Sequence, residues 1–144
     1  MMKRVTNLTP DISEELKKDP VRPSIRPHKR LGSNKDVFYE VSEKGEIEAV
    51  VCVTYTNDVP DCESNLFEMP GDEIAIFYSV WSNKAGAGRK IIFDAVDKIT
   101  NENKNIQRFV TLSPDTKIAE RFHLRNGAVV HRINKDTVNY EYLK

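Results

Sequence analysis

The sequence has 144 residues, 39% of them hydrophobic, which is enough for one compact domain with a real core. Its 22 Lys and Arg residues balance 22 Asp and Glu residues, so overall electrostatics favour neither a nucleic acid nor an acidic membrane surface as partner. The two cysteines have neither metal-ligand spacing nor the density of a disulfide scaffold, and no segment is typical of a targeting signal or a membrane span. We therefore expect a cytoplasmic protein.

A short helix is expected at residues 9–18, where a capping threonine and a proline precede early acids and late lysines. Residues 19–34 then hold three prolines among five basic residues, which predicts an extended surface segment. That segment is either a solvated connection or a basic lip near a phosphate or substrate. We expect a single domain, with residues 1–35 as this N-terminal part and residues 36–144 as the core.

Strands dominate the next stretch. Residues 36–43 and 46–56 are rich in β-branched and aromatic side chains and are separated by a short turn, which predicts a hairpin. The second strand is apolar on both faces and should be central. Residues 57–72 form a long turn-rich insertion of the kind that often serves as a lid, and Leu66 and Phe67 should hold it down.

The second half alternates strands and helices. Residues 73–81 and 106–113 predict strands, and the apolar residues of 91–104 repeat at helical spacing. A further helix should be capped by Ser113 and stop at Gly127. Two final strands, "AVVHRIN" and "TVNYEYL", predict a closing hairpin in a mixed α/β sheet.

The segment "SNKAGAGRK" lies between a predicted buried strand and a predicted helix. The first turn of a helix presents unpaired N–H groups and partial positive charge, so this junction can hold an anion. Gly86 and Gly88 would let the backbone approach it, and Lys84, Arg89 and Lys90 add full charges. The spacing matches neither the P-loop nor the dinucleotide fingerprint, and a tight turn without a ligand would give the same pattern.

This segment resembles the acetyl-CoA loop of the GNAT acyltransferases, Q/R-x-x-G-x-G/A, with Asn83 at the first position. Downstream, "AERFHLRNGA" resembles the family segment A-x-x-h-Y-x-x-x-G-F, where h is apolar. His123 falls on the tyrosine that commonly protonates the departing CoA thiolate in that family. The resemblance covers residues 36–144 and implies that His123 is the proton donor.

The resemblance implies a GNAT-like α/β fold: a central, mainly antiparallel mixed sheet, flanked by helices and splayed where the cofactor enters. Acetyl-CoA or another acyl-CoA would be the co-substrate, with its pyrophosphate on the turn and its pantetheine along the strand that ends near Val80. The backbone N–H of Val80 or of a neighbouring residue is our candidate donor to the thioester oxygen. The expected cofactor-binding residues are Val80, Lys84, Ala85, Gly86, Ala87, Gly88, Arg89 and Lys90.

A closer likeness lies within this broad one. The segments "IFYS", "LSP", "FHLRNGA", "HRIN" and "NYEY" resemble, in the same order, the catalytic domain of malonyl-CoA decarboxylase, itself of GNAT fold. That domain uses a histidine, here His123, and a serine of an "FYSxS" segment. The sequence keeps Ser79 but has Trp81 at the second serine position, with Ser82 next. It also lacks the helical N-terminal domain of those enzymes.

Acyl transfer, most often to an amine, is the function that we expect. Glu73 is either a general base for the amine or a solvated strand end. A malonyl-CoA decarboxylase-like reaction using His123 and Ser79 is the alternative, and an acyl-CoA-binding module without catalysis is a third. The acceptor, a small molecule or a peptide, is not identified. We expect no metal, nucleic acid or membrane partner, and a homodimer stays open.

Overall fold

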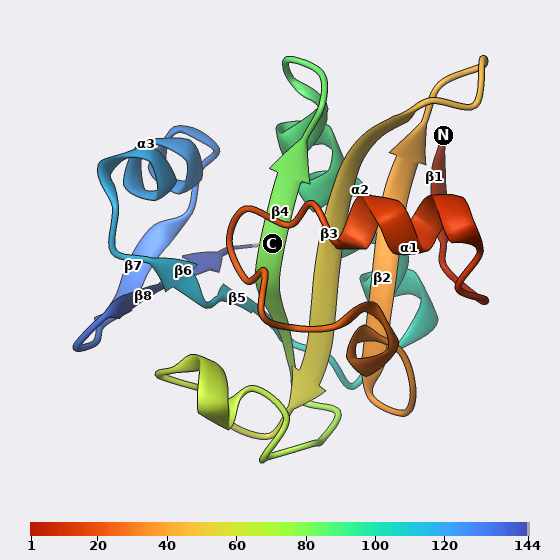
Figure 1. Ribbon diagram of the computed structural model, residues 1–144. Helices are drawn as coiled ribbons and strands as arrows, with labels where there is room; N and C mark the ends of the chain where they lie inside the picture. The colour runs from red at the N-terminus through yellow and green to blue at the C-terminus, as the bar shows by residue number, and fades with distance from the viewer. Residues whose placement is uncertain (144) are drawn as a thin grey trace.

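The computed structural model describes residues 1–143, so Lys144, the last residue of the expected core, lies outside the described residues (Figure 1). In chain order the elements are β1 (Met2–Arg4), α1 (Pro10–Leu16), β2 (Lys35–Val41), β3 (Ile47–Thr56), β4 (Ile74–Ser82), α2 (Ala87–Glu102), β5 (Arg108–Thr111), β6 (Ser113–Pro114), α3 (Lys117–Arg125), β7 (Val129–Ile133) and β8 (Thr137–Tyr142). Within this part of the chain, no helix is long and apolar enough to cross a membrane.

One mixed sheet organises the domain. The strand order is β1-β2-β3-β4-β5-β8-β6, and β7 pairs with β8. Every named strand pair is antiparallel except β4–β5, which is parallel. Figure 1 shows α1 on one face of the sheet and α2 on the other. This is the predicted architecture, and the hairpin of β2 and β3 lies where the sequence placed it.

Each face of the sheet has its own apolar core. The face under α2 includes Ile91, Ile92 and Ala95, which repeat along that helix as the periodicity predicts. The face under α1 includes Leu16 and the side chain of Cys52. The two faces explain why β3 is apolar on both sides, because it lies between two helical layers.

Strands β4 and β5 separate partway along the sheet. Their pairing runs from Ile74 to Phe77 on β4, whereas β4 continues to Ser82. A bulge interrupts the β3–β4 register at the same place, because Cys52 pairs with Ser79 and the next β3 residue pairs with Phe77. Tyr78 is therefore the extra residue. The splay that the fold resemblance implied is present at this point.

The start of α3 differs from our prediction. Its N-cap is Thr116, whose hydroxyl accepts a hydrogen bond from the Ala119 N–H at 3.2 Å. Ser113 does not cap the helix, because Ser113 and Pro114 form β6 and pair with β8. Either hydroxyl could cap a helix, and pairing with a distant strand decides between them.

The basic segment at residues 19–34 also differs in part from both interpretations of the sequence. Arg30 is fully buried and pairs with the buried Asp19, and Arg22 donates to the carbonyl of Leu112 at 2.9 Å. Three other basic residues, Arg26, His28 and Lys29, are exposed, as a solvated connection predicts. The two buried cations fix the segment against the sheet, and its residues that line the cleft described below carry no charge.

The insertion at residues 57–72 is held down by Leu66 and Phe67, as expected: Leu66 is buried and Phe67 packs edge-on against Tyr78. However, it lies at the end of the sheet where β3 finishes (Figure 1). None of its residues lines the cleft described below, which contradicts its interpretation as a lid over the site.

Candidate functional site

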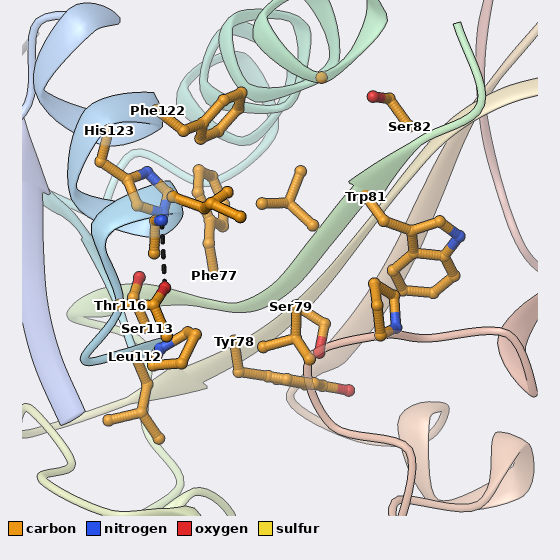
Figure 2. Close-up of a pocket in the computed structure, with 17 residues that line it drawn as sticks. Phe77, Tyr78, Ser79, Trp81, Ser82, Leu112, Ser113, Thr116, Phe122 and His123 are labelled. Atoms are coloured by element: carbon orange, nitrogen blue, oxygen red, sulfur yellow. Dashed lines mark hydrogen bonds between the residues drawn. The ribbon is translucent and has the colours of Figure 1, made fainter. Parts of the chain in front are cut away.

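A cleft of about 500 Å³ opens where β4 and β5 separate. Its walls come from the second half of β4, the segment after β5, the start and middle of α3, and the turn before Arg22 (Figure 2). The lining residues are Pro20, Val21, Phe77, Tyr78, Ser79, Val80, Trp81, Ser82, Gly88, Leu112, Ser113, Pro114, Thr116, Ile118, Ala119, Phe122 and His123. Among these described residues there is no Asp, Glu, Lys or Arg. The cleft is therefore an apolar channel with a few hydroxyls and one imidazole.

The glycine turn lies at the α2 end of this cleft. Gly86 is the N-cap of α2 with φ of 82°, a left-handed conformation that favours glycine, and no side chain caps the helix. The N–H of Ala87 donates to the Lys84 carbonyl, and the N–H groups of Gly88 and Arg89 have no earlier helical carbonyl to reach. The turn thus presents two N–H groups in a field that favours an anion.

Gly88 joins this turn to the cleft, which it also lines. A Cβ on Gly88 would lie 3.3 Å from two ring carbons of Phe122 and 3.6 Å from the hydroxyl of Ser82. The absent side chain lets α2 approach α3 closely. Glycine at this position therefore allows close packing of the two helices, in addition to any role in binding a ligand.

Two of the expected cations are neutralised by carboxylates. Lys84 pairs with Glu48 at 3.1 Å. Lys90 pairs with the buried Glu40 at 3.1 Å and with Asp94 at 2.7 Å, and these partners raise the pKa of Lys90. Both charges are paired with carboxylates, so the helix terminus, more than these lysines, supplies the positive potential.

Arg89 is different. Its guanidinium donates to the side-chain oxygen of Asn126 at 3.1 Å and lies 4.9 Å from the centre of the Phe93 ring. Among the ion pairs of the described residues, Arg89 has none. It is the uncompensated cation of the turn.

His123 lies on α3 with its ring enclosed by aromatic side chains and is 4% exposed. The ring stacks on Tyr140 with centroids 5.0 Å apart and meets Phe122 and Tyr142 edge-on. Its Nδ1 lies 2.7 Å from the Tyr142 hydroxyl oxygen. Burial lowers the pKa of His123 to about 4, so the imidazole is neutral near pH 7.

Ser79 and His123 belong to opposite faces of the sheet. Ser79 pairs with Cys52, whose side chain lies in the core under α1, while the aromatic partners of His123 lie in the core under α2. Figure 2 shows Ser79 directed away from His123. The Ser79 hydroxyl is buried without a hydrogen-bond partner within residues 1–143. The structure brings both residues to one cleft but does not bring them together.

Three further expected residues lie in the cleft or in the glycine turn, and one does not. Val80 lines the cleft beyond the last β4–β5 pair, and Ala85 and Ala87 lie in the turn, Ala85 exposed and Ala87 buried. Glu73 stands at the opposite end of β4, seven residues from Val80 and so roughly 23 Å along a strand. That separation contradicts its interpretation as a base for the cleft.

The sequence interpretation missed several contributors to the site. Pro20 and Val21 form a wall of the cleft, Tyr142 contacts His123, and Asn126 contacts Arg89. Tyr142 belongs to the quoted "NYEY" segment, so a signal was present, but a strand pattern does not say which distant side chain it meets. Within residues 1–143, no group of three or more His, Cys, Asp or Glu side chains is placed to hold a metal ion.

Comparisons with solved structures find malonyl-CoA decarboxylases and GNAT acetyltransferases. The decarboxylase from Cupriavidus metallidurans aligns with a TM-score of 0.77 at 16% identity, over 99% of this chain and 60% of that one. The decarboxylase from Rhodopseudomonas palustris gives 0.77 at 20% identity, over 99% and 56%. A Bacillus subtilis acetyltransferase in complex with CoA gives 0.68 at 11% identity, over 99% and 97%.

The chain thus spans less than two thirds of the length of those two decarboxylase chains. No protein-family model matches the sequence, and no curated protein matches it significantly. At these identities the likeness concerns the fold. It confirms the prediction that the sequence made: this chain has the GNAT fold, in a form also found in malonyl-CoA decarboxylase.

Proposed function

We propose that this protein is an enzyme that binds an acyl-CoA and acts on its thioester. The diphosphate would lie on the first turn of α2 and the pantetheine in the cleft between β4 and β5. One observation carries the proposal: Gly88 belongs both to the uncapped first turn of α2 and to the lining of the cleft. An anion site and an apolar channel that share a residue match a ligand with a charged head and a long neutral arm.

The reacting end of that ligand would lie near Val80 and His123. The Val80 N–H is the candidate donor to the thioester oxygen, because β4 has no β5 partner at that position. His123 is the group in the cleft lining whose ordinary pKa lies near neutral pH, and it can donate a proton or a hydrogen bond. Ser79 would act, if at all, from the other face of the sheet.

Acyl transfer to an amine, from a small molecule or a peptide, is the first candidate for the reaction. The amine would attack the thioester carbon, the C–S bond would break, and the CoA thiolate would receive a proton. The Bacillus subtilis acetyltransferase structure has CoA bound on this fold, which supports acetyl-CoA or another acyl-CoA as co-substrate.

Decarboxylation of malonyl-CoA is the second candidate, and the composition of the cleft favours it. Its lining holds no carboxylate that could deprotonate an amine. Decarboxylation needs no acceptor and no base. It needs a poorly solvated place for the substrate carboxylate and donors for the enolate oxygen, after which the carbanion takes up a proton.

Binding tests the shared part of the proposal. CoA, acetyl-CoA and malonyl-CoA should each give a calorimetric signal, and at ~100 times its dissociation constant a ligand should stabilise the native state by about 2.7 kcal/mol. No signal from any of the three at millimolar concentration would contradict the proposal. Binding without turnover would leave the acyl-CoA-binding module as the function.

Products distinguish the reactions. Acetyl-CoA with a pool of amines and peptides should release free thiol if the enzyme transfers acyl groups, while malonyl-CoA alone should yield carbon dioxide and acetyl-CoA if it decarboxylates. In either case His123→Gln should lower turnover by roughly 10²- to 10⁴-fold with little change in CoA affinity. Wild-type turnover in His123→Gln would exclude His123 from the chemistry.

A further inference from the structure

The two nitrogens of the His123 ring have different surroundings. Nδ1 lies 2.7 Å from the Tyr142 hydroxyl oxygen in a buried contact. Nε2 has no hydrogen-bond partner within residues 1–143, yet it is not among the unpartnered side-chain atoms that are shut off from solvent. Since His123 lines the cleft, Nε2 is the nitrogen that a ligand in the cleft can reach.

A hydrogen bond between Tyr142 and His123 can run in either direction, and the surroundings of the Tyr142 hydroxyl determine which. Nδ1 of His123 lies 2.7 Å from the Tyr142 oxygen, and within residues 1–143 the hydroxyl has no other acceptor at hydrogen-bond distance. Tyr142 is buried. If Nδ1 donated, the Tyr142 O–H would therefore be buried without an acceptor, which costs free energy.

The direction of this hydrogen bond determines the tautomer of the imidazole. The Tyr142 O–H donates to Nδ1 of His123. A nitrogen that accepts a hydrogen bond carries no proton, so the ring proton lies on Nε2.

We propose that Tyr142 holds His123 as the neutral Nε2–H tautomer and directs that N–H into the cleft, as a hydrogen-bond donor to the reacting thioester. Tyr142 is thus a positioning residue. The direction of the N–H follows from the geometry alone, whereas its use on a thioester rests on the proposed function. The role requires only that negative charge developing on the thioester oxygen or sulfur accepts a hydrogen bond, with the ring remaining neutral.

The burial of the ring makes the tautomer decisive. An imidazolium would donate from both nitrogens, but burial leaves His123 neutral near pH 7, so one nitrogen alone can donate. With the proton on Nδ1, the cleft would face a lone pair and developing negative charge would be repelled.

The tautomer can be read without any substrate. In uniformly ¹⁵N-labelled protein at pH 7, long-range proton–nitrogen NMR correlations should show the His123 proton on Nε2. Tyr142→Phe keeps the ring that meets His123 edge-on and removes only the hydroxyl, so it should give a mixture of the two tautomers. Tyr140→Phe is the matched control, because Tyr140 stacks on the same imidazole but makes no hydrogen bond with it among the described residues. It should leave the Nε2–H tautomer unchanged.

Steady-state kinetics, with whichever acyl-CoA the enzyme turns over in the product assays, give the second readout. Tyr142→Phe should lower kcat by at least roughly tenfold with little change in KM for the acyl-CoA, since the wrong tautomer offers no donor, and Tyr140→Phe should stay within about twofold. A wild-type ring protonated on Nδ1, or a Tyr142→Phe ring that keeps the wild-type tautomer, would overturn the proposal. If NMR shows the expected tautomers but the protein turns over no acyl-CoA, the result would count against the proposed function and not against this hydrogen-bond arrangement.

Discussion

The guanidinium of Arg30 lies 2.6 Å from the carboxylate of Asp19, and neither side chain is exposed to solvent. The same guanidinium also donates to the carbonyls of Arg22 and Ile25. Asp19→Asn would leave a buried cation without its counter-charge, which should lower the free energy of unfolding by about 3–5 kcal/mol in urea titrations.

The exposed pair between Lys17 and Glu14 provides a control for that substitution. Its two side chains are 60% and 71% exposed, so Glu14→Gln should change stability by less than about 1 kcal/mol. An Asp19→Asn protein as stable as the Glu14→Gln protein would show that the buried pair does not hold residues 19–34 in place.

Stability should fall as the solution is acidified through the range in which unfolded histidine gains its proton. The pKa of His123 is lowered from 6.5 to about 4 by burial, so between these values the unfolded chain binds a proton that the folded chain does not. The contribution of His123 to stability is therefore complete above pH 6.5 and is lost as the pH falls toward 4. Below pH 4 this group causes no further change. The difference amounts to about 3 kcal/mol.

Chemical denaturation at several pH values would measure this effect. His123→Gln lacks the titrating group, so its stability should vary less between pH 6.5 and pH 4 than that of the wild-type protein. Parallel pH profiles for the two proteins would mean that His123 is not buried in the neutral form.

A negative charge in the glycine turn should weaken binding of an acyl-CoA. Ala85 is exposed and precedes the N-cap Gly86, so Ala85→Glu introduces charge without displacing a packed side chain. Ala85→Gln has nearly the same shape and no charge. We expect the dissociation constant for CoA, measured by calorimetry, to rise at least roughly tenfold for the glutamate variant relative to the glutamine variant, by repulsion of the diphosphate.

The salt dependence of the same pair makes the interpretation specific. The difference between Ala85→Glu and Ala85→Gln should shrink at high ionic strength, because exposed charges are screened. Equal affinities at low salt would place the diphosphate elsewhere.

Ser79 and Ser82, two of the three serines that line the cleft, should respond differently to truncation. The Ser79 hydroxyl is buried without a partner within residues 1–143, so Ser79→Ala should keep the stability and change turnover by less than about threefold. Ser82 lies at the end of β4 beside Gly88, on the side of the cleft where Phe122 packs, and Ser82→Ala should have the larger effect on turnover.

Steady-state kinetics with the active thioester, together with urea titrations, would test both variants. A loss of turnover in Ser79→Ala at unchanged stability would instead support the alternative in which Ser79 takes part in decarboxylation.

Local sequence patterns predicted most of the fold because the signals act over a few residues. The helical spacing of apolar residues gave α2, and β-branched runs gave β2, β3 and β4. The failures involve contacts between distant segments. Thr116 replaces Ser113 as the cap because Ser113 joins a sheet through β8, and Arg30 is buried because Asp19 and two carbonyls meet it there.

In the candidate site, too, local motifs predicted one part of the arrangement and contacts between distant segments determined the rest. The motifs bring His123, Val80 and Gly88 to one cleft, as the resemblance implied. The direction of Ser79 depends on the bulge at Tyr78, since one extra residue changes the face to which the following side chain points. A sequence pattern cannot anticipate that reversal without the register of the neighbouring strand.

The early end of the β4–β5 pairing creates a strand edge inside the molecule. Beyond Phe77, one side of β4 has backbone groups that no β5 residue pairs with, as at the margin of a sheet, but the groups face the cleft instead of the surroundings. A ligand arm that carries amide groups could pair there as a substitute strand. In that case amide hydrogen exchange between Tyr78 and Ser82 should slow on binding, and a ligand without amides should leave it fast.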